Sequence, residues 1–271
     1  MLNNQELAKI AKSVRRNIIK MVTEAKSGHI GGAFSAAEIV VSLYFNEMKI
    51  DQANVKEPNR DKFVLSKGHA SALLYAVLSE KGFLPEAELL TFRKINSNLQ
   101  GHPNMHYVDG VDMSTGSLGQ GLSAAIGMAL SYKIHHQEFR VYSLIGDGES
   151  EEGQIWEAAM AAAHYKLDNL CAVLDMNGLQ IDGDVTKVMN PYPLDAKFEA
   201  FGWHVIRVDG HDYDQLQAAY LEARSIKGKP TMIIAKTVKG KGVSFMENQA
   251  GWHGVAPTPE QALAALKELE D

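Results

Sequence analysis

The stretch that decides the fold runs from Phe139 to Asp182 and reads FRVYSLIGDGESEEGQIWEAAMAAAHYKLDNLCAVLDMNGLQID. It begins with a short apolar run over 139–145, typical of a β-strand, that stops at Gly146-Asp147-Gly148. The pattern then predicts an alanine-rich helix over 152–165 and a second strand over 169–174. A strand, a helix and a strand in this order predict a βαβ unit with two parallel, neighbouring strands.

Asp147 and Asn177 each follow one of these two strands. Because the carboxyl ends of parallel neighbours open onto the same edge of a sheet, we expect both side chains at one rim. A carboxylate, an amide oxygen and glycines beside a helix N-terminus suit a hard cation that carries a diphosphate, and Mg²⁺ fits this donor set best. A Gly-Asp-Gly sequence by itself is commonly an ordinary turn, so the distant asparagine gives the pattern its weight.

The composition is that of an ordinary soluble globular protein, with 271 residues of which 45% are hydrophobic and 22% charged. The net charge of −6 and the lack of a basic block give no support to nucleic-acid or membrane binding. The single cysteine, Cys171, lies in an apolar strand pattern, which favours a reducing compartment. The amphipathic N-terminus does not resemble a secretory signal, and no apolar run reaches about 18 residues. We therefore expect a cytoplasmic protein.

The rest of the chain continues the alternation of helices and strands. Further strands are expected over 62–66, 203–208 and 231–236, and helices over 4–26, 70–80, 85–94, 117–136, 214–227 and 259–269. Ser35 and Glu38 match a capping box that starts a helix reaching Met48, and 182–194 reads as an irregular loop. The pattern predicts one α/β domain over 1–271, a doubly wound, mostly parallel sheet with helices on both faces.

Four histidines lie in glycine-bearing loops: His29 in SGHIGG, His69 in SKGHAS, His102 in GHPN and His253 in GWHG. A single loop histidine is most often a surface residue, but four in similar settings indicate a site. Glycine beside each ring lets a substrate approach the backbone, and imidazole relays protons near neutral pH. Zinc is the alternative reading, although zinc ligands often come in close pairs and these four are scattered.

Seven segments occur in the order found in transketolases: SGHIGGAFSAAEI, SKGHAS, GHP, STGSLGQGLS, GDGESEEGQIWEA, DMNGLQIDG and WHGVAP. They cover most of the chain, and the sequence resembles the amino-terminal, diphosphate-binding domain of a transketolase. The histidine motifs favour transketolases over the related pyruvate dehydrogenases and deoxyxylulose phosphate synthases. The resemblance implies thiamine diphosphate as the cofactor, with Mg²⁺ as its metal and Ca²⁺ or Mn²⁺ as substitutes.

The resemblance also implies roles for the motif residues. The expected metal ligands are the Asp147 and Asn177 side chains and the Leu179 carbonyl. Gly148 would contact the diphosphate, while Gly116 and Leu118 would contact the aminopyrimidine through the main chain. The expected cofactor-binding set is completed by His69, His253 and Glu152, the last a residue that helps to link paired active sites in the family. A first-turn glutamate favoured by the helix dipole explains Glu152 equally well. The expected catalytic residues are His29, His69, His102 and His253.

A full transketolase continues through a pyrimidine-binding domain and a carboxyl-terminal domain, which carry the glutamate that activates the cofactor and the basic residues that hold the sugar phosphate. We therefore expect the amino-terminal subunit of a split transketolase, with an expressed fragment as the alternative. The expected assembly is a homodimer of this chain within an α2β2 complex that acts on sugar phosphates. Two other readings stay open: a subunit of another thiamine-diphosphate enzyme acting on a different ketose or keto acid, and a non-catalytic regulatory homologue.

Overall fold

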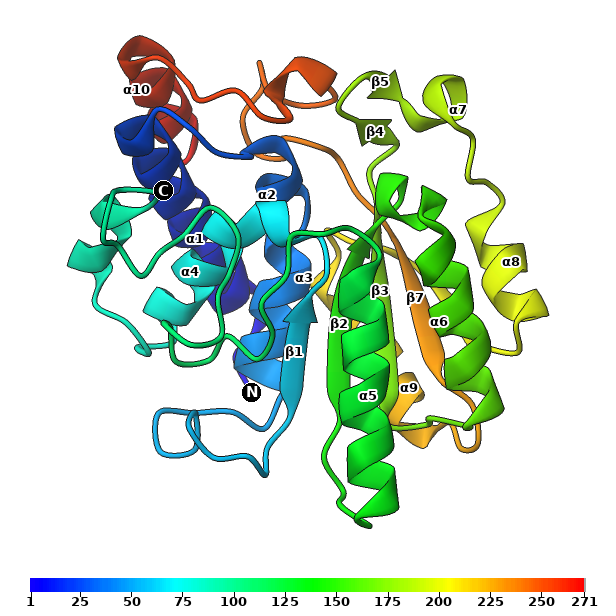
Figure 1. Cartoon of the computed structure of the whole chain (residues 1–271). Coiled ribbons are helices and arrows are strands. Elements are labelled where there is room, and N and C mark those ends of the chain that lie inside the picture. The colour runs from blue at the N-terminus through cyan, green and yellow to red at the C-terminus, as the bar shows by residue number, and fades with distance from the viewer. Residues whose placement is uncertain (271) are drawn as a thin grey trace.

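A five-stranded parallel sheet forms the centre of the computed structural model, which describes residues 1–270 (Figure 1). The strand order is β1-β2-β3-β7-β6. The strands are β1 (Lys62–Leu65), β2 (Val141–Gly146), β3 (Leu170–Met176), β6 (His204–Asp209) and β7 (Thr231–Lys236). In the register of β2 with β3, Gly146 lies opposite Asp175, so the loops after these two strands leave the sheet side by side. The predicted βαβ unit and the doubly wound α/β fold are confirmed.

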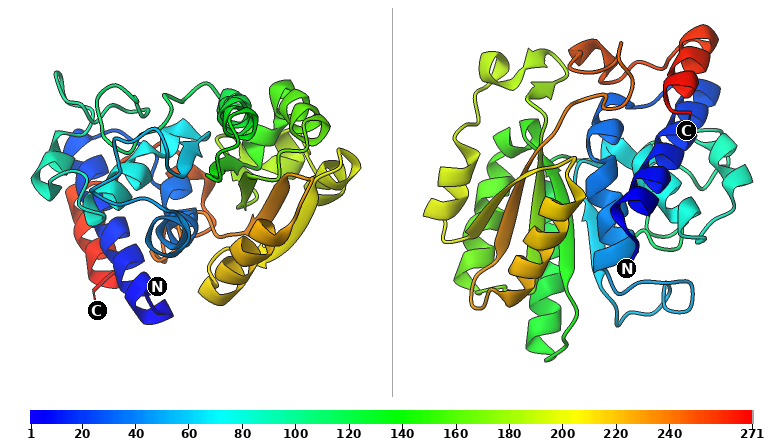
Figure 2. Two further views of the ribbon diagram at one scale, coloured as in Figure 1. Left: turned by 90° about the horizontal axis from the view of Figure 1, so that it is seen from below. Right: turned by 180° about the vertical axis from the view of Figure 1, so that it is seen from behind.

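Helices cover both faces of the sheet. One face carries α1 (Asn4–Ala25), α3 (Ala37–Ser42), α4 (Ser71–Glu80) and α9 (Tyr213–Ser225), with α10 (Pro259–Glu268) packed on α1. The other carries α5 (Gln120–Ile134), α6 (Gly153–His164) and α8 (Leu194–Ala200). Figure 2 shows α9 on the face opposite α5 and α6.

The strands are apolar on both faces because each face is covered. Tyr142 and Leu144 of β2 lie in the core on the α1 side, whereas Val141 and Ile145 lie in the core on the α5 side. Successive side chains of a strand point to opposite faces, so a strand buried on both sides reads as a continuous apolar run. The short run over 139–145 therefore marked a central strand correctly.

The predicted capping box at Ser35 is wrong. Ser35 ends a short helix, α2 (Gly31–Ser35), and its hydroxyl donates to Asp175 Oδ2 at 2.6 Å. Helix α3 begins without a side-chain cap, and Glu38 instead pairs with Arg15 at 2.6 Å. A π-helical turn, Leu43–Glu47, follows α3. Local spacing suggested a cap, but a buried hydroxyl next to a buried carboxylate forms the stronger hydrogen bond.

Smaller differences concern loops and short helices. The predicted helix over 85–94 is the 3₁₀ helix Glu86–Thr91, and α5 starts only after Gly119, whose φ is +84°. The region 182–194, read as an irregular loop, holds strand β5 (Gly183–Asp184), helix α7 (Val185–Val188) and the start of α8; β5 pairs antiparallel with β4 (Leu179–Gln180), which comes just before this region. Further 3₁₀ turns are Gly68–Ala70, Gly148–Glu151 and Ala250–Trp252. Within residues 1–270 no helix is both long and apolar enough to cross a membrane.

Candidate active site

A cavity of about 260 Å³ opens at the carboxyl ends of the central strands. Its walls come from the loops that follow β1, β2, β3 and β7, together with the two loops that carry His29 and His253. The sequence-predicted residues in its lining are His29, His69, Gly116, Leu118, Asp147, Gly148, Asn177, Leu179 and His253. Three larger cavities, of about 430, 780 and 810 Å³, contain none of these residues. The chemistry predicted from the sequence therefore converges on one place.

Asp147 lies buried at the end of β2, against the turn that follows β3. Its Oδ1 accepts the Gly148 N–H at 2.8 Å, and its Oδ2 accepts the Gly178 N–H at 2.6 Å. The strand order thus brings Asp147 to the same rim as Asn177, as expected. Burial, together with the negative charge of Asp175, raises the pKa of Asp147 to about 6.

The expected metal ligands form an all-oxygen set. Asn177 Oδ1 accepts the Leu179 N–H at 3.1 Å, and the Leu179 carbonyl accepts from Lys239 Nζ at 2.8 Å. No ion pair joins Asp147 to a basic side chain within the described residues 1–270. A buried carboxylate with a raised pKa beside an amide and a carbonyl oxygen fits a hard divalent cation, whose charge would favour the ionised form.

Three of the four predicted histidines meet in the cavity. The ring centroids of His29, His69 and His253 lie 5.1 to 5.4 Å apart, with His69 and His253 stacked. Burial is the main reason that the pKa of His29 falls to about 4 and that of His253 to about 3, and it also lowers the pKa of His69. All three rings are therefore neutral at pH 7, each with one donor and one acceptor nitrogen.

Two ring nitrogens in this cluster differ in their partners. His253 Nδ1 lies 2.8 Å from Lys239 Nζ, so it accepts a hydrogen bond from the ammonium and leaves Nε2 as the N–H. His29 Nδ1 is buried and has no hydrogen-bond partner among residues 1–270. No group of three or more His, Cys, Asp or Glu side chains in that range is arranged to hold a metal ion, so the geometry does not support the zinc reading.

His102 and Glu152 lie outside the cavity lining. The His102 ring is packed behind Gly116, where an added Cβ would lie 2.7 Å from ring carbon Cδ2. Gly116 also has a φ of +142°, so this position accepts only glycine without strain. Glu152 is exposed at the start of α6 and contacts Gly119. Its position does not test the expected link between paired active sites.

Residues 7–269 match the family described as the thiamine diphosphate binding domain of transketolase. The chain belongs to the transketolase family. The resemblance on which the site residues were predicted is thereby confirmed, and so is the fold that it implied.

Relatives of two lengths are similar to this transketolase domain. It is 46% identical over 261 residues to a 6-deoxy-6-sulfo-D-fructose transketolase subunit of Clostridium sp. (strain MSTE9), covering 96% of this chain and 94% of that one. It is 41% identical over 257 residues to an apulose-4-phosphate transketolase subunit of Phocaeicola vulgatus, covering 95% and 91%. The crystal structure of Campylobacter jejuni transketolase matches with a TM-score of 0.94 and 36% identity, covering 99% of this chain but 43% of that one.

Sequence reasoning missed two lysines of the transketolase site. Lys67 Nζ donates to Asp175 Oδ2 at 2.5 Å and to the Gly32 carbonyl at 2.7 Å, which ties the His29 loop to the end of β3. Lys239 donates to both Leu179 and His253, and burial lowers its pKa to about 8. Lys67 directly follows a predicted strand and Lys239 comes three positions after one, and a positive charge at that end of a sheet was a readable signal for an anionic ligand.

Glu149 is the third functional residue that the sequence did not single out. Its side chain is fully buried and accepts three hydrogen bonds: from the Ser66 hydroxyl and the Gly119 N–H at 3.0 Å on Oε1, and from the Gly146 N–H at 3.1 Å on Oε2. Ser66, Gly119 and Gly146 belong to the loops that carry His69, Leu118 and Asp147. One carboxylate therefore joins three walls of the cavity, and its burial raises its pKa.

Proposed function

We propose that this chain is the amino-terminal subunit of a two-subunit transketolase, which moves a two-carbon ketol unit from a ketose phosphate to an aldose phosphate. The observation that supports it best is one cavity that joins an all-oxygen cation site to three neutral histidines, in a chain of the transketolase family. Its alignment with 94% and 91% of two relatives named as transketolase subunits supports the division between two chains.

The proposed partner is a subunit with the pyrimidine-binding and carboxyl-terminal domains. Residues 1–271 of this chain would form a single domain, and two copies of each chain an α2β2 assembly in the cytoplasm. This chain aligns with 43% of the length of the C. jejuni enzyme, and the proposed partner would correspond to the remainder. In this scheme Glu152, exposed at the start of α6, faces a second copy of the chain.

The proposed cofactor is thiamine diphosphate with Mg²⁺, or with Ca²⁺ or Mn²⁺ as a substitute. The Asp147 and Asn177 side chains and the Leu179 carbonyl would hold the metal, and Lys239 would balance diphosphate charge. When bound, the cofactor supplies a nucleophilic carbon and an electron sink for breaking and forming the carbon–carbon bond beside a carbonyl. Gly116 and Leu118 would orient its aminopyrimidine through their main-chain groups.

The histidines would bind and orient the sugar. With pKa values near 4 and 3, His29 and His253 are neutral at pH 7 and act as hydrogen-bond partners of hydroxyl groups. His29 Nδ1 is buried without a partner within residues 1–270 and is the first candidate to bind a substrate hydroxyl. His69 completes this wall of the cavity, and His102 supports it from behind Gly116.

Reconstitution tests the proposal. Ketol transfer is expected when the partner chain is mixed with this one, and ketol transfer by this chain alone would refute the division of the enzyme. Asp147→Ala is expected to abolish metal-dependent cofactor binding, whereas Asp182→Ala, which removes an exposed carboxylate, serves as the matched control. Transfer from keto acids but not ketoses would favour another enzyme of this cofactor class. No cofactor binding even with the partner present would favour a non-catalytic homologue.

A further inference from the structure

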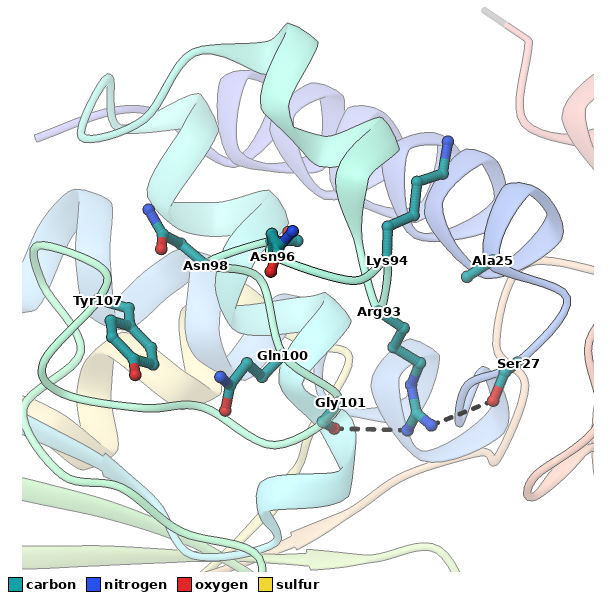
Figure 3. A pocket seen from close by; sticks show the side chains of 10 residues that line it. Ala25, Ser27, Arg93, Lys94, Asn96, Asn98, Gln100, Gly101 and Tyr107 are labelled. Atoms are coloured by element: carbon teal, nitrogen blue, oxygen red, sulfur yellow. Dashed lines mark hydrogen bonds between the residues drawn. The ribbon is translucent and has the colours of Figure 1, made fainter.

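A second cavity, of about 780 Å³, lies beyond the C-terminal end of α1 (Figure 3). Its lining holds hydroxyl and amide groups, including Ser27, Gln100 and Tyr107, and the two cations Arg93 and Lys94, but no carboxylate. Lys94 is exposed and pairs with Glu24 at 2.7 Å. Among the described residues 1–270, no carboxylate compensates the charge of the other lining cation, Arg93, and the cavity is electrostatically suited to an anion.

Arg93 is half-buried and, like Arg140, has no carboxylate partner within residues 1–270, but the cavity beside Arg140 is lined by carboxylates and that beside Arg93 is not. Arg93 Nη1 donates to Ser27 Oγ at 3.1 Å and its Nη2 to the Gly101 carbonyl at 3.4 Å, while Nε is buried without a partner (Figure 3). No carboxylate within residues 1–270 pairs with it, and burial lowers its pKa. The two fully buried arginines differ, since Arg15 and Arg60 each bind a carboxylate through two nitrogens.

A partly buried guanidinium without a counter-charge favours the binding of an anion, because the ligand supplies the missing negative charge. The Arg93 guanidinium has an unused Nε–H and weakly engaged Nη groups. Such a fork of N–H donors matches the oxygen atoms of a phosphate or a sulfonate. The backbone of Arg93 adds to the cost, because its φ of +60° is uncommon for a residue with a side chain.

The Arg93 cavity adjoins the histidine cluster. The two groups that accept hydrogen bonds from Arg93, on Ser27 and Gly101, belong to the loops that carry His29 and His102. After burial, the positive charge of Arg93 is the largest influence that lowers the pKa of both His29 and His102. A sugar bound to His29 by a hydroxyl group would therefore have Arg93 within electrostatic reach.

We propose that Arg93 binds the negatively charged end group of the sugar substrate, a phosphate or a sulfonate. This inference rests on the proposed function and adds a residue of this chain to the basic residues expected on the partner. It assigns part of the substrate specificity to the amino-terminal subunit. Ser27 and the carbonyl of Gly101 hold the guanidinium at the boundary between the cavity and the histidine loops.

The kinetic test compares charged and uncharged substrates in the reconstituted two-subunit enzyme. For Arg93→Gln, we expect the KM for an aldose phosphate to rise on the order of tenfold, as for a lost charge-assisted hydrogen bond, with little change for the same aldose without phosphate. A ketose sulfonate as donor shows whether sulfonate is bound in the same way. Arg93→Lys should retain part of the effect. Lys94→Gln, on the same cavity wall, should leave both KM values unchanged.

The opposite pattern overturns the proposal. If Arg93→Gln lowers kcat/KM equally for the charged and the uncharged aldose, Arg93 only braces the Ser27 and Gly101 loops. A separate measurement on this chain alone uses inorganic phosphate as the probe and follows the backbone N–H signals of Ser27 and Gly101, the two residues that contact Arg93, by NMR. Saturable shifts that Lys94→Gln keeps and Arg93→Gln removes support the anion site even if ketol transfer fails. No shift, together with unchanged KM values, refutes the site while ketol transfer still proceeds.

Discussion

Glu149→Ala is expected to destabilise the fold and the cofactor site together. The substitution leaves three buried donors without an acceptor, the Ser66 hydroxyl and the Gly119 and Gly146 N–H groups. Each unsatisfied buried donor costs about 1–3 kcal/mol, so the free energy of unfolding should fall by about 3–9 kcal/mol before relaxation. Because the three loops carry His69, Leu118 and Asp147, the affinity for cofactor with Mg²⁺ should fall as well.

Glu149→Gln tests the two carboxylate oxygens of Glu149 separately, because it replaces only one of them. Glutamine can keep the Oε1 contacts to Ser66 and Gly119 but places an NH₂ opposite the Gly146 N–H, so its loss should be limited to about 1–3 kcal/mol. Urea denaturation at pH 7 and calorimetric cofactor titration measure both effects. Glu157→Ala, an exposed glutamate on α6, is the control and should stay within about 0.5 kcal/mol. Equal stability and affinity of Glu149→Ala and this control would refute the reasoning.

Three further outcomes follow from charges at the site. The pKa of Asp147 is about 6, and a bound cation requires the ionised carboxylate, so metal-dependent cofactor affinity should fall about tenfold per pH unit below pH 6. Calorimetric titrations between pH 5 and 8 measure this dependence. An affinity that does not change with pH contradicts the prediction. His29 and His253 have pKa values lowered from 6.5 to about 4 and about 3, so their contribution to stability is complete above pH 6.5 and is lost as the pH falls towards those values. Urea denaturation at several pH values should show this slope, and His253→Gln should reduce it. Lys67→Met leaves Asp175 buried without its cation and should cost about 3–5 kcal/mol of unfolding free energy in the same assay, whereas a loss below about 1 kcal/mol contradicts this role.

The sheet and the common location of the expected metal ligands were predictable from local patterns. A parallel strand covered on both faces is a short apolar run, and its carboxyl end is marked by the first glycine or aspartate after it. Gly146-Asp147 and Asp175-Asn177 both follow this rule, and the βαβ rule then places them together. The histidine motifs were readable because each is short and continuous in the sequence.

The supporting contacts could not be predicted, because they join distant segments. Lys67 and Asp175 lie 108 positions apart, and Glu149 and Ser66 lie 83 apart. Neither local sequence indicates which residue is the hydrogen-bond partner. Ser35 shows the opposite error: its local sequence predicted a helix cap, but its hydroxyl donates to a carboxylate 140 positions away. The spacing of the four histidines likewise did not reveal that His102 lies behind Gly116 rather than in the cavity lining.

The contact of His253 with His29 and His69 affects the order in which parts of the molecule form during synthesis. These rings come from the beginning and the end of the chain, and α10 also packs on α1. During synthesis the strands of the sheet leave the ribosome before residue 253, so the sheet can form while the histidine cluster still lacks a member. The site is thus assembled last, and a chain interrupted before residue 253 would be a scaffold with one wall of its cavity missing.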